Sequence, residues 1–291
     1  SWVKYTTYRD ECVCIYCANF TLCLTAIQNA AGERLSPGEL KAPCTCNPAS
    51  VKCVLHECKQ CPGKEALTLQ HLHLDDDDEE VYVATWDSGD LLQRCLDPLD
   101  FLEEVRKWTW LHIRHEFLRH NQGTAIYLEK VSVTSHRIVL HFDFAENWSV
   151  VLPSAVQGYH WRNREISIFT CVATTSKSTL SFAVISDDMR HDSAHAQLAT
   201  RCIESWIEDN VQLFAQVTYV SDGAASHFKN RFQLYELGRS DYRRKWLFSA
   251  TGHGKSACDG IGGVIKHLAA LYNLRASPST AVLSAEDLVH A

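Results

Sequence analysis

The strongest constraint on the fold of this chain is a succession of apolar runs and amphipathic stretches between residues 137 and 274. Runs rich in branched and aromatic residues are typical of buried strands, and they occur at 137–144, 165–173, 180–185, 216–220 and 245–250. Apolar residues at helical spacing predict helices over about 192–208 and 261–274. The order of three strands, helix, two strands and helix predicts an α/β layered fold, a mixed sheet flanked by helices.

Three acidic residues stand where such a sheet would bring them together. Asp143 lies at or near the end of the first strand, Asp222 follows the fourth strand directly, and Asp259 lies in the turn that opens the last helix. Carboxylates are the hard ligands that Mg²⁺ prefers, and two ions about 3.5–4 Å apart can promote phosphodiester cleavage. Each residue taken alone also fits an ordinary turn, because Asp caps its own backbone. Their order along the chain favours a joint metal site.

Five further polar residues fit the surroundings of such a site. Glu146 could add a ligand or a base, or form a surface salt bridge. Lys229 and Arg231 follow Asp222 and are candidate phosphate contacts, although each also fits a solvated surface charge. His253 and Lys255 lie in GHGK, a glycine-flanked loop that could offer backbone N–H groups and one charge to a phosphate. The spacing is not that of a P-loop, so ATP binding is not predicted.

The chain has 13 cysteines, most of them before residue 62. The odd number and the CxC and CxxC spacings favour metal ligation over a disulfide framework. Cys14, Cys17, Cys58 and Cys61 form two CxxC pairs and predict a structural tetrahedral Zn²⁺ site. Buried thiols are the alternative. The cysteines that could replace members of this set are Cys12, Cys44, Cys46 and Cys53.

The chain divides by composition into four parts. We expect a Cys-rich zinc-binding segment over 1–74, an acidic linker and helical region over 75–125, a catalytic domain over 126–276 and a tail over 277–291. The helical region has apolar spacing from about 87 to 121, with a break near Pro98. His112, His115 and His120 fall in it and are interpreted as packing or polar surface residues. We also expect a partner segment before Ser1, such as a DNA-binding module, and no membrane span.

Four segments of the second half resemble the DDE/DDD DNA transposases, which have a ribonuclease H-like, or retroviral integrase, fold. They are HFDFAENWSVV with Gln157, His160 and Trp161 behind it, SDDMRHD, YVSDGAASHFKNRF and TGHGKSACDGIGGVIKHLA, and together they span about 137–270. The chain is similar in particular to a group of uncharacterised, transposon-derived eukaryotic proteins, and SVKCVLHECKQCP looks like the Cys motif of that group.

The resemblance implies Mg²⁺- or Mn²⁺-dependent DNA cleavage and strand transfer at transposon ends, in the nucleus, by a dimer or larger synaptic assembly. Asp143 and Asp222 match the first two acids of the family triad. Many relatives carry Glu as the third acid, but no Glu lies between Glu236 and Glu286, so Asp259 takes that place. The alternative is an inactive, domesticated remnant that binds DNA or chromatin through a zinc module. The net charge of −7 neither supports nor excludes DNA binding.

Overall fold

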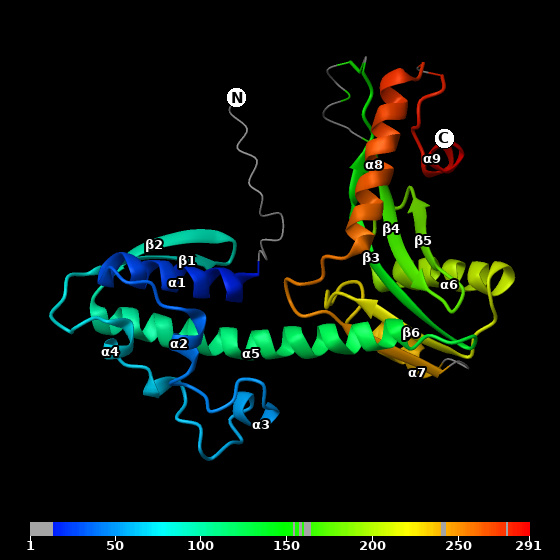
Figure 1. Ribbon diagram of the computed structural model, residues 1–291. Helices are drawn as coiled ribbons and strands as arrows, with labels where there is room; N and C mark the ends of the chain where they lie inside the picture. The colour runs from blue at the N-terminus through cyan, green and yellow to red at the C-terminus, as the bar shows by residue number, and fades with distance from the viewer. Residues whose placement is uncertain (1–13, 154, 157–158, 160–163, 240–242, 278) are drawn as a thin grey trace. The chain divides into compact units, whose positions relative to one another are not determined.

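The computed structural model describes residues 14–291 except 154, 157–158, 160–163, 240–242 and 278. The chain forms two compact units, with the boundary between Asn121 and Gln122. Helix α5 (Pro98–Val131) runs through this boundary (Figure 1). None of the helices in the described ranges is long and apolar enough to cross a lipid bilayer.

The first unit is mostly helical and contains one β-hairpin. Its core consists of large apolar side chains from α1, α2, α4, β1 and α5, including Phe20, Ile27, Leu40, Val83 and Phe101. Its elements before α5 are α1 (Ile15–Ala31), α2 (Pro37–Lys41), α3 (Val51–Val54), η1 (Lys64–Ala66), α4 (Leu69–Leu72), β1 (Val81–Asp87) and β2 (Asp90–Leu96). Residues 75–80 form the predicted acidic loop.

The hairpin corrects the prediction of helical structure from about residue 87. β1 and β2 pair antiparallel, and they are joined by Ser88 and Gly89, which have φ values of 50° and 98°. Two consecutive residues with positive φ make a turn whose twist suits a two-residue hairpin. Leu91 and Leu92, which suggested a helical face, remain exposed on β2. Pro98 begins α5 rather than breaking a helix, since proline tolerates the first helical position.

The second unit contains a five-stranded mixed sheet in the order β5-β4-β3-β6-β7. β3, β4 and β5 pair antiparallel, whereas β6 runs parallel to β3 and β7 runs parallel to β6. All the predicted strands and both predicted helices are present, so the mixed α/β architecture is confirmed. The elements are β3 (Arg137–Ser149), β4 (Glu165–Thr174), β5 (Thr179–Ser186), α6 (Ser193–Asn210), β6 (Gln216–Ser221), α7 (Arg231–Arg239), β7 (Arg243–Phe248), α8 (Ala257–Arg275) and α9 (Ala285–His290).

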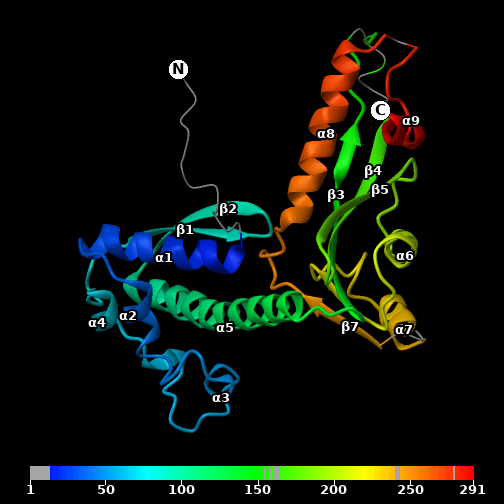
Figure 2. The same cartoon turned by 45° about the vertical axis from the view of Figure 1, so that its right-hand side comes forward.

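Helices cover the two faces of this sheet (Figure 2). On one face Ala196, Ala199 and Ile203 of α6 pack against Leu140 and Phe142 of β3. On the other face α8 crosses β3 and β4, and Ala269 joins a smaller core. Val282 is buried in this smaller core, with Leu283, Ala285 and Leu288 packed against it, so the described residues from 279 to 291 do not form the separate tail that we expected over 277–291.

Candidate functional site: a carboxylate cluster and a cysteine cluster

Asp143 lies on β3, and Asp222 directly follows the neighbouring parallel strand β6. The β3–β6 register pairs Arg137 with Gln216 and ends at His141 with Val220. Continuing this register by two residues brings Asp143 opposite Asp222. β6 ends at Ser221, whereas β3 continues to Ser149, so Asp143 lies in the interior of a long strand rather than at its end. Asp143 therefore stands on β3 just beyond its last pairing with β6.

Asp259 reaches the same region from the first turn of α8. The Cys258 thiol donates a hydrogen bond to the main-chain oxygen of His141 at 3.1 Å, which fixes the start of α8 over β3. One Asp259 carboxylate oxygen accepts a hydrogen bond from the Ser256 backbone N–H at 2.7 Å, as part of a capping box. Asp259 thus serves as a helix cap, and its side chain remains exposed to solvent.

The three carboxylates interact electrostatically. The pKa of Asp143 is raised from its usual 3.8 to about 7, first by burial and then by the negative charges of Asp222 and Asp259. Among the described residues, no lysine or arginine forms an ion pair with any of the three. A partly buried acid near two further acids lacks a counter-charge, and a divalent cation would supply one.

The three side chains do not form a closed cage for a single ion. Their oxygens do not all lie within 4.8 Å of one another, unlike the ligand atoms of two Cys-containing groups in the described chain. Asp222 also bonds locally, since its carboxylate accepts the Ala224 backbone N–H at 3.0 Å. An open set of acids fits ions that keep water and substrate oxygens as their remaining ligands.

The predicted supporting residues lie in three places. The GHGK loop lies against the site, because a Cβ placed on Gly254 would be 3.1 Å from the Cβ of Asp222. His253 in this loop is half-buried and Lys255 is exposed. Lys229 and Arg231 are exposed and lie over the rings of Phe248 and Phe232, respectively. Glu146 is exposed, and only its main-chain oxygen bonds, to Lys266 at 3.3 Å.

Two histidines that the sequence did not assign to the site flank it. His191 stacks on Phe144 with ring centroids 4.3 Å apart. The ring centroid of His227 lies 5.9 Å from that of His191. Burial lowers the pKa of His227, although the negative charges of Asp222 and Asp192 oppose this effect. His227 is therefore within electrostatic range of Asp222. Asp222 and His227 both lie in the segment SDGAASHF, but their spacing in the sequence does not predict that the two side chains lie close together.

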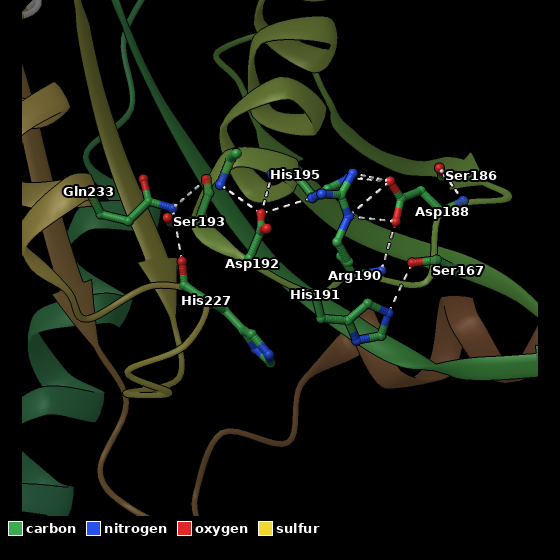
Figure 3. A network of polar contacts seen from close by, with 11 residues as sticks. Ser167, Ser186, Asp188, Arg190, His191, Asp192, Ser193, His195, His227 and Gln233 are labelled. Atoms are coloured by element: carbon green, nitrogen blue, oxygen red, sulfur yellow. Dashed lines mark hydrogen bonds and ion pairs between the residues drawn. The ribbon is translucent and has the colours of Figure 1, made fainter.

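The acidic residues before α6 have structural partners (Figure 3). Asp192 caps α6 by accepting the backbone N–H groups of Ala194 and His195 at 2.9 and 3.0 Å. Asp188 binds the Arg190 guanidinium at 2.5 Å. His191 bonds the Ser167 hydroxyl at 2.9 Å. Asp192 and His191 therefore bond different partners, Asp192 at the start of α6 and His191 on β4.

The cysteines group differently from the predicted pairing of the two CxxC motifs. Cys46 Sγ lies 3.4 Å from Cys53 Sγ, 3.7 Å from Cys58 Sγ and 3.4 Å from Cys61 Sγ. All four sulfurs lie within 4.8 Å of one another, so this tetrathiol cluster could hold a metal such as zinc. Hydrogen bonds, chiefly from the Cys46 backbone N–H, lower the pKa of Cys61 to about 6.

The remaining cysteines of the prediction lie elsewhere. The ligand atoms of Cys14 and Cys17 lie together with a nitrogen of His115, not with Cys58 and Cys61. The Cys44 thiol is buried and bonds the main-chain oxygen of Leu40 at 3.6 Å, which removes it from the metal candidates. Cys12 lies outside the described residues, as do Gln157, His160 and Trp161.

Comparison with known proteins gives a family but no activity. No curated protein sequence matches the chain. Residues 122–291 match a family model described as "Domain of unknown function (DUF8701)". This range coincides with the second unit, which holds the sheet and the three acidic residues. Because the match covers more than half of the sequence, the chain belongs to the DUF8701 family.

Proposed function

We propose that the second unit is a ribonuclease H-like core that cleaves DNA phosphodiester bonds and transfers strands, as a transposase does. The element order is compatible with this proposal, because β3, β4, β5, α6, β6, β7 and α8 follow the order that the sequence pattern predicts, with α7 as an addition. The mixed sheet with a helix layer on each face is compatible with such a core. Fold alone does not determine chemistry, so the proposal depends on the site.

The observation that carries the proposal is that Asp222 and Asp259, from two other elements, act electrostatically on Asp143. Burial first, and then these two negative charges, raise the pKa of Asp143 to about 7. All three offer hard oxygen ligands, and no described lysine or arginine neutralises them. This donor set fits Mg²⁺ or Mn²⁺, which would supply an activated water and stabilise the leaving 3′ oxygen.

The chain's own residues have separable tasks in this proposal. Asp143 and Asp222 would hold the metal ions, and Asp259 from α8 would complete the set of ligands. Lys255, Lys229 and Arg231 are exposed cations on the loops around Asp222 and would contact DNA phosphates. Burial and desolvation keep Asp143 protonated until it binds a cation, so binding would release a proton near neutral pH.

The cysteine cluster adds a structural element to the proposal. We assign Zn²⁺ to Cys46, Cys53, Cys58 and Cys61, since four thiols with no open position are typical of a structural site. The expected partners are transposon-end and target DNA and further copies of the chain, and the expected location is the nucleus. These assignments depend on the transposase resemblance.

A second candidate function is a DNA- or chromatin-binding module without catalysis. The specific observation in its favour is that two of the acids have local structural roles. Asp259 caps α8 through Ser256, and Asp222 closes a turn through Ala224. Acids that serve only these roles would bind no divalent cation.

Cleavage of end-labelled duplex DNA in Mg²⁺ or Mn²⁺ tests the first function. We expect Asp222→Asn to abolish nicking, since the amide cannot replace the charged ligand. Asp209→Asn is the matched control, because Asp209 is an exposed acid at the end of α6. Equal nicking by wild type and Asp222→Asn would refute the assignment. Calorimetric titration with Mn²⁺ separates the two functions, because the binding module would bind DNA in a salt-dependent way but not Mn²⁺.

A further inference from the structure

We propose that Cys14, Cys17 and His115 are ligands of a second metal centre in the first unit, separate from the tetrathiol cluster. The centre takes Zn²⁺ or another divalent cation that prefers thiolate and imidazole ligands. It is independent of the proposed nuclease function, because none of its ligands belongs to the carboxylate site. His115 was interpreted from the sequence as a packing or polar surface residue, and it is indeed buried, with its ring packed against Tyr16. The proposal adds a ligand role to this packing.

The start of α1 presents both thiols. Cys14 is the N-cap residue of α1, and its main-chain oxygen accepts the Ala18 N–H at 2.9 Å. Cys17 lies three residues later, in the first turn, so the two side chains share one side of the helix end. Both thiols are thereby presented from one end of the helix, in the i, i+3 spacing of a metal-binding pair.

His115 comes from the middle of α5, about one hundred residues later in the chain. Its Nε2 atom lies 3.2 Å from Cys14 Sγ. The ligand atoms of Cys14, Cys17 and His115 all lie within 4.8 Å of one another. With Zn–S near 2.3 Å and Zn–N near 2.0–2.1 Å, two tetrahedral ligands are about 3.6–3.8 Å apart. The observed spacing is close to that of a loaded site.

The environment makes a metal a better explanation than a hydrogen bond alone. Cys14 is 2% and His115 is 5% exposed, and Tyr16 packs on the His115 ring at 5.0 Å. Two of the three ligand side chains, Cys14 and His115, are buried, and Cys17 is half-buried beside them. A metal ion would bind all three at once. The burial of Cys14 also disfavours the alternative of a reactive thiol activated by histidine, which needs access to substrate.

Metal content measures the proposal directly. The protein is purified with reducing agent, dialysed against trace Zn²⁺, and analysed for zinc per chain by mass spectrometry. We expect about two equivalents in the wild type, one from each centre. Cys17→Ser and His115→Ala should each remove one equivalent, and Cys58→Ser should remove the other. Cys95→Ser and His120→Ala are matched controls, since both residues are exposed and lie in the same unit.

A second variant distinguishes the loss of a metal ligand from a loss of zinc caused by misfolding. His115→Cys offers a thiolate in place of the imidazole and should retain the second equivalent that His115→Ala loses. Cobalt substitution gives an independent reading, because thiolate-to-cobalt absorbance should fall in Cys17→Ser and persist in His120→Ala. An unchanged zinc content in Cys17→Ser and His115→Ala would overturn the proposal. So would a Cys14–Cys17 disulfide in the purified protein, or rapid alkylation of both thiols that is equally fast with and without a chelator.

Discussion

Gly262 of α8 passes Ala145 of β3 so closely that a Cβ on Gly262 would lie 2.7 Å from the Cβ of Ala145. The Ala145 side chain is a single methyl group, so it cannot rotate away to make room for an added Cβ on Gly262. A glycine at this position lets α8 lie directly on the sheet, and α8 carries Asp259 in its first turn. The close approach therefore determines how near Asp259 comes to Asp143.

Substituting Gly262 tests this dependence. We expect Gly262→Ala to lower the free energy of unfolding of the second unit by about 1–3 kcal/mol, because overpacking forces the helix away from the sheet. Mn²⁺ affinity should fall as well, since Asp259 moves with the helix. Urea denaturation and calorimetric titration measure the two effects.

Gly263→Ala is the control for the same substitution one residue later. A Cβ on Gly263 meets no atom within 4 Å, and helix propensity predicts a stability gain of up to about 1 kcal/mol. Equal stability of the two variants would show that the contact with Ala145 does not constrain α8.

The ionisation of Asp143 predicts a pH-dependent stability. The folded state holds the Asp143 proton up to about pH 7, whereas the unfolded chain loses it near 3.8. Without metal, the folded state is therefore penalised as pH rises from about 4 to 7, and the penalty is complete above pH 7. Asp143→Asn should relieve it and raise the free energy of unfolding at pH 8 by about 1–3 kcal/mol, allowing for solvent around the partly exposed carboxyl.

Thermal denaturation in chelator at pH 4 and pH 8 checks this prediction. The difference between wild type and Asp143→Asn should be small at pH 4 and large at pH 8. Excess Mn²⁺ should stabilise the wild type alone, because the variant lacks the charged ligand. If Asp143→Asn is less stable than wild type at pH 8 in chelator, the ionised Asp143 does not destabilise the folded state, and the prediction is wrong.

The central strands β3, β4 and β6 of the second unit were predictable because most of their residues are buried. The runs around Phe142 and Val220 are rich in apolar residues, and such a run predicts a buried strand without information on distant residues. The β1–β2 hairpin was missed because Leu91 and Leu92 imitate helical spacing, while the informative signal was the Ser88–Gly89 turn.

The metal sites show the limit of spacing arguments. The Cys58-x2-Cys61 pair was identified correctly as a unit, but its partners are Cys46 and Cys53 and not the similar Cys14-x2-Cys17 pair. Spacing specifies which ligands are local, and the fold decides which local pairs meet. His115 could not be found in this way, since it approaches Cys14 only through the packing of α5 against α1.

Removal of metal from the tetrathiol cluster should loosen residues 44–61. This segment contains only the four-residue α3 and few buried apolar side chains, so the cross-links of a metal would contribute much of its stability. We expect chelation, or Cys58→Ser, to increase trypsin cleavage at Lys52 and Lys59 by at least about tenfold. Cys95→Ser should leave the rate unchanged. Equal cleavage with and without chelator would exclude a metal as the structural support.

The two roles of Asp259 can be separated with two substitutions. Asparagine keeps a side-chain oxygen that can accept the Ser256 N–H but lacks the negative charge, whereas alanine lacks both. We expect Asp259→Ala to cost about 1 kcal/mol of unfolding free energy through the lost cap, and Asp259→Asn to cost little. If Asp259 is a metal ligand, both variants should lose Mn²⁺-dependent nicking of duplex DNA. Full nicking by Asp259→Asn would instead assign this residue to capping alone, and would leave Asp143 and Asp222 as a two-acid site.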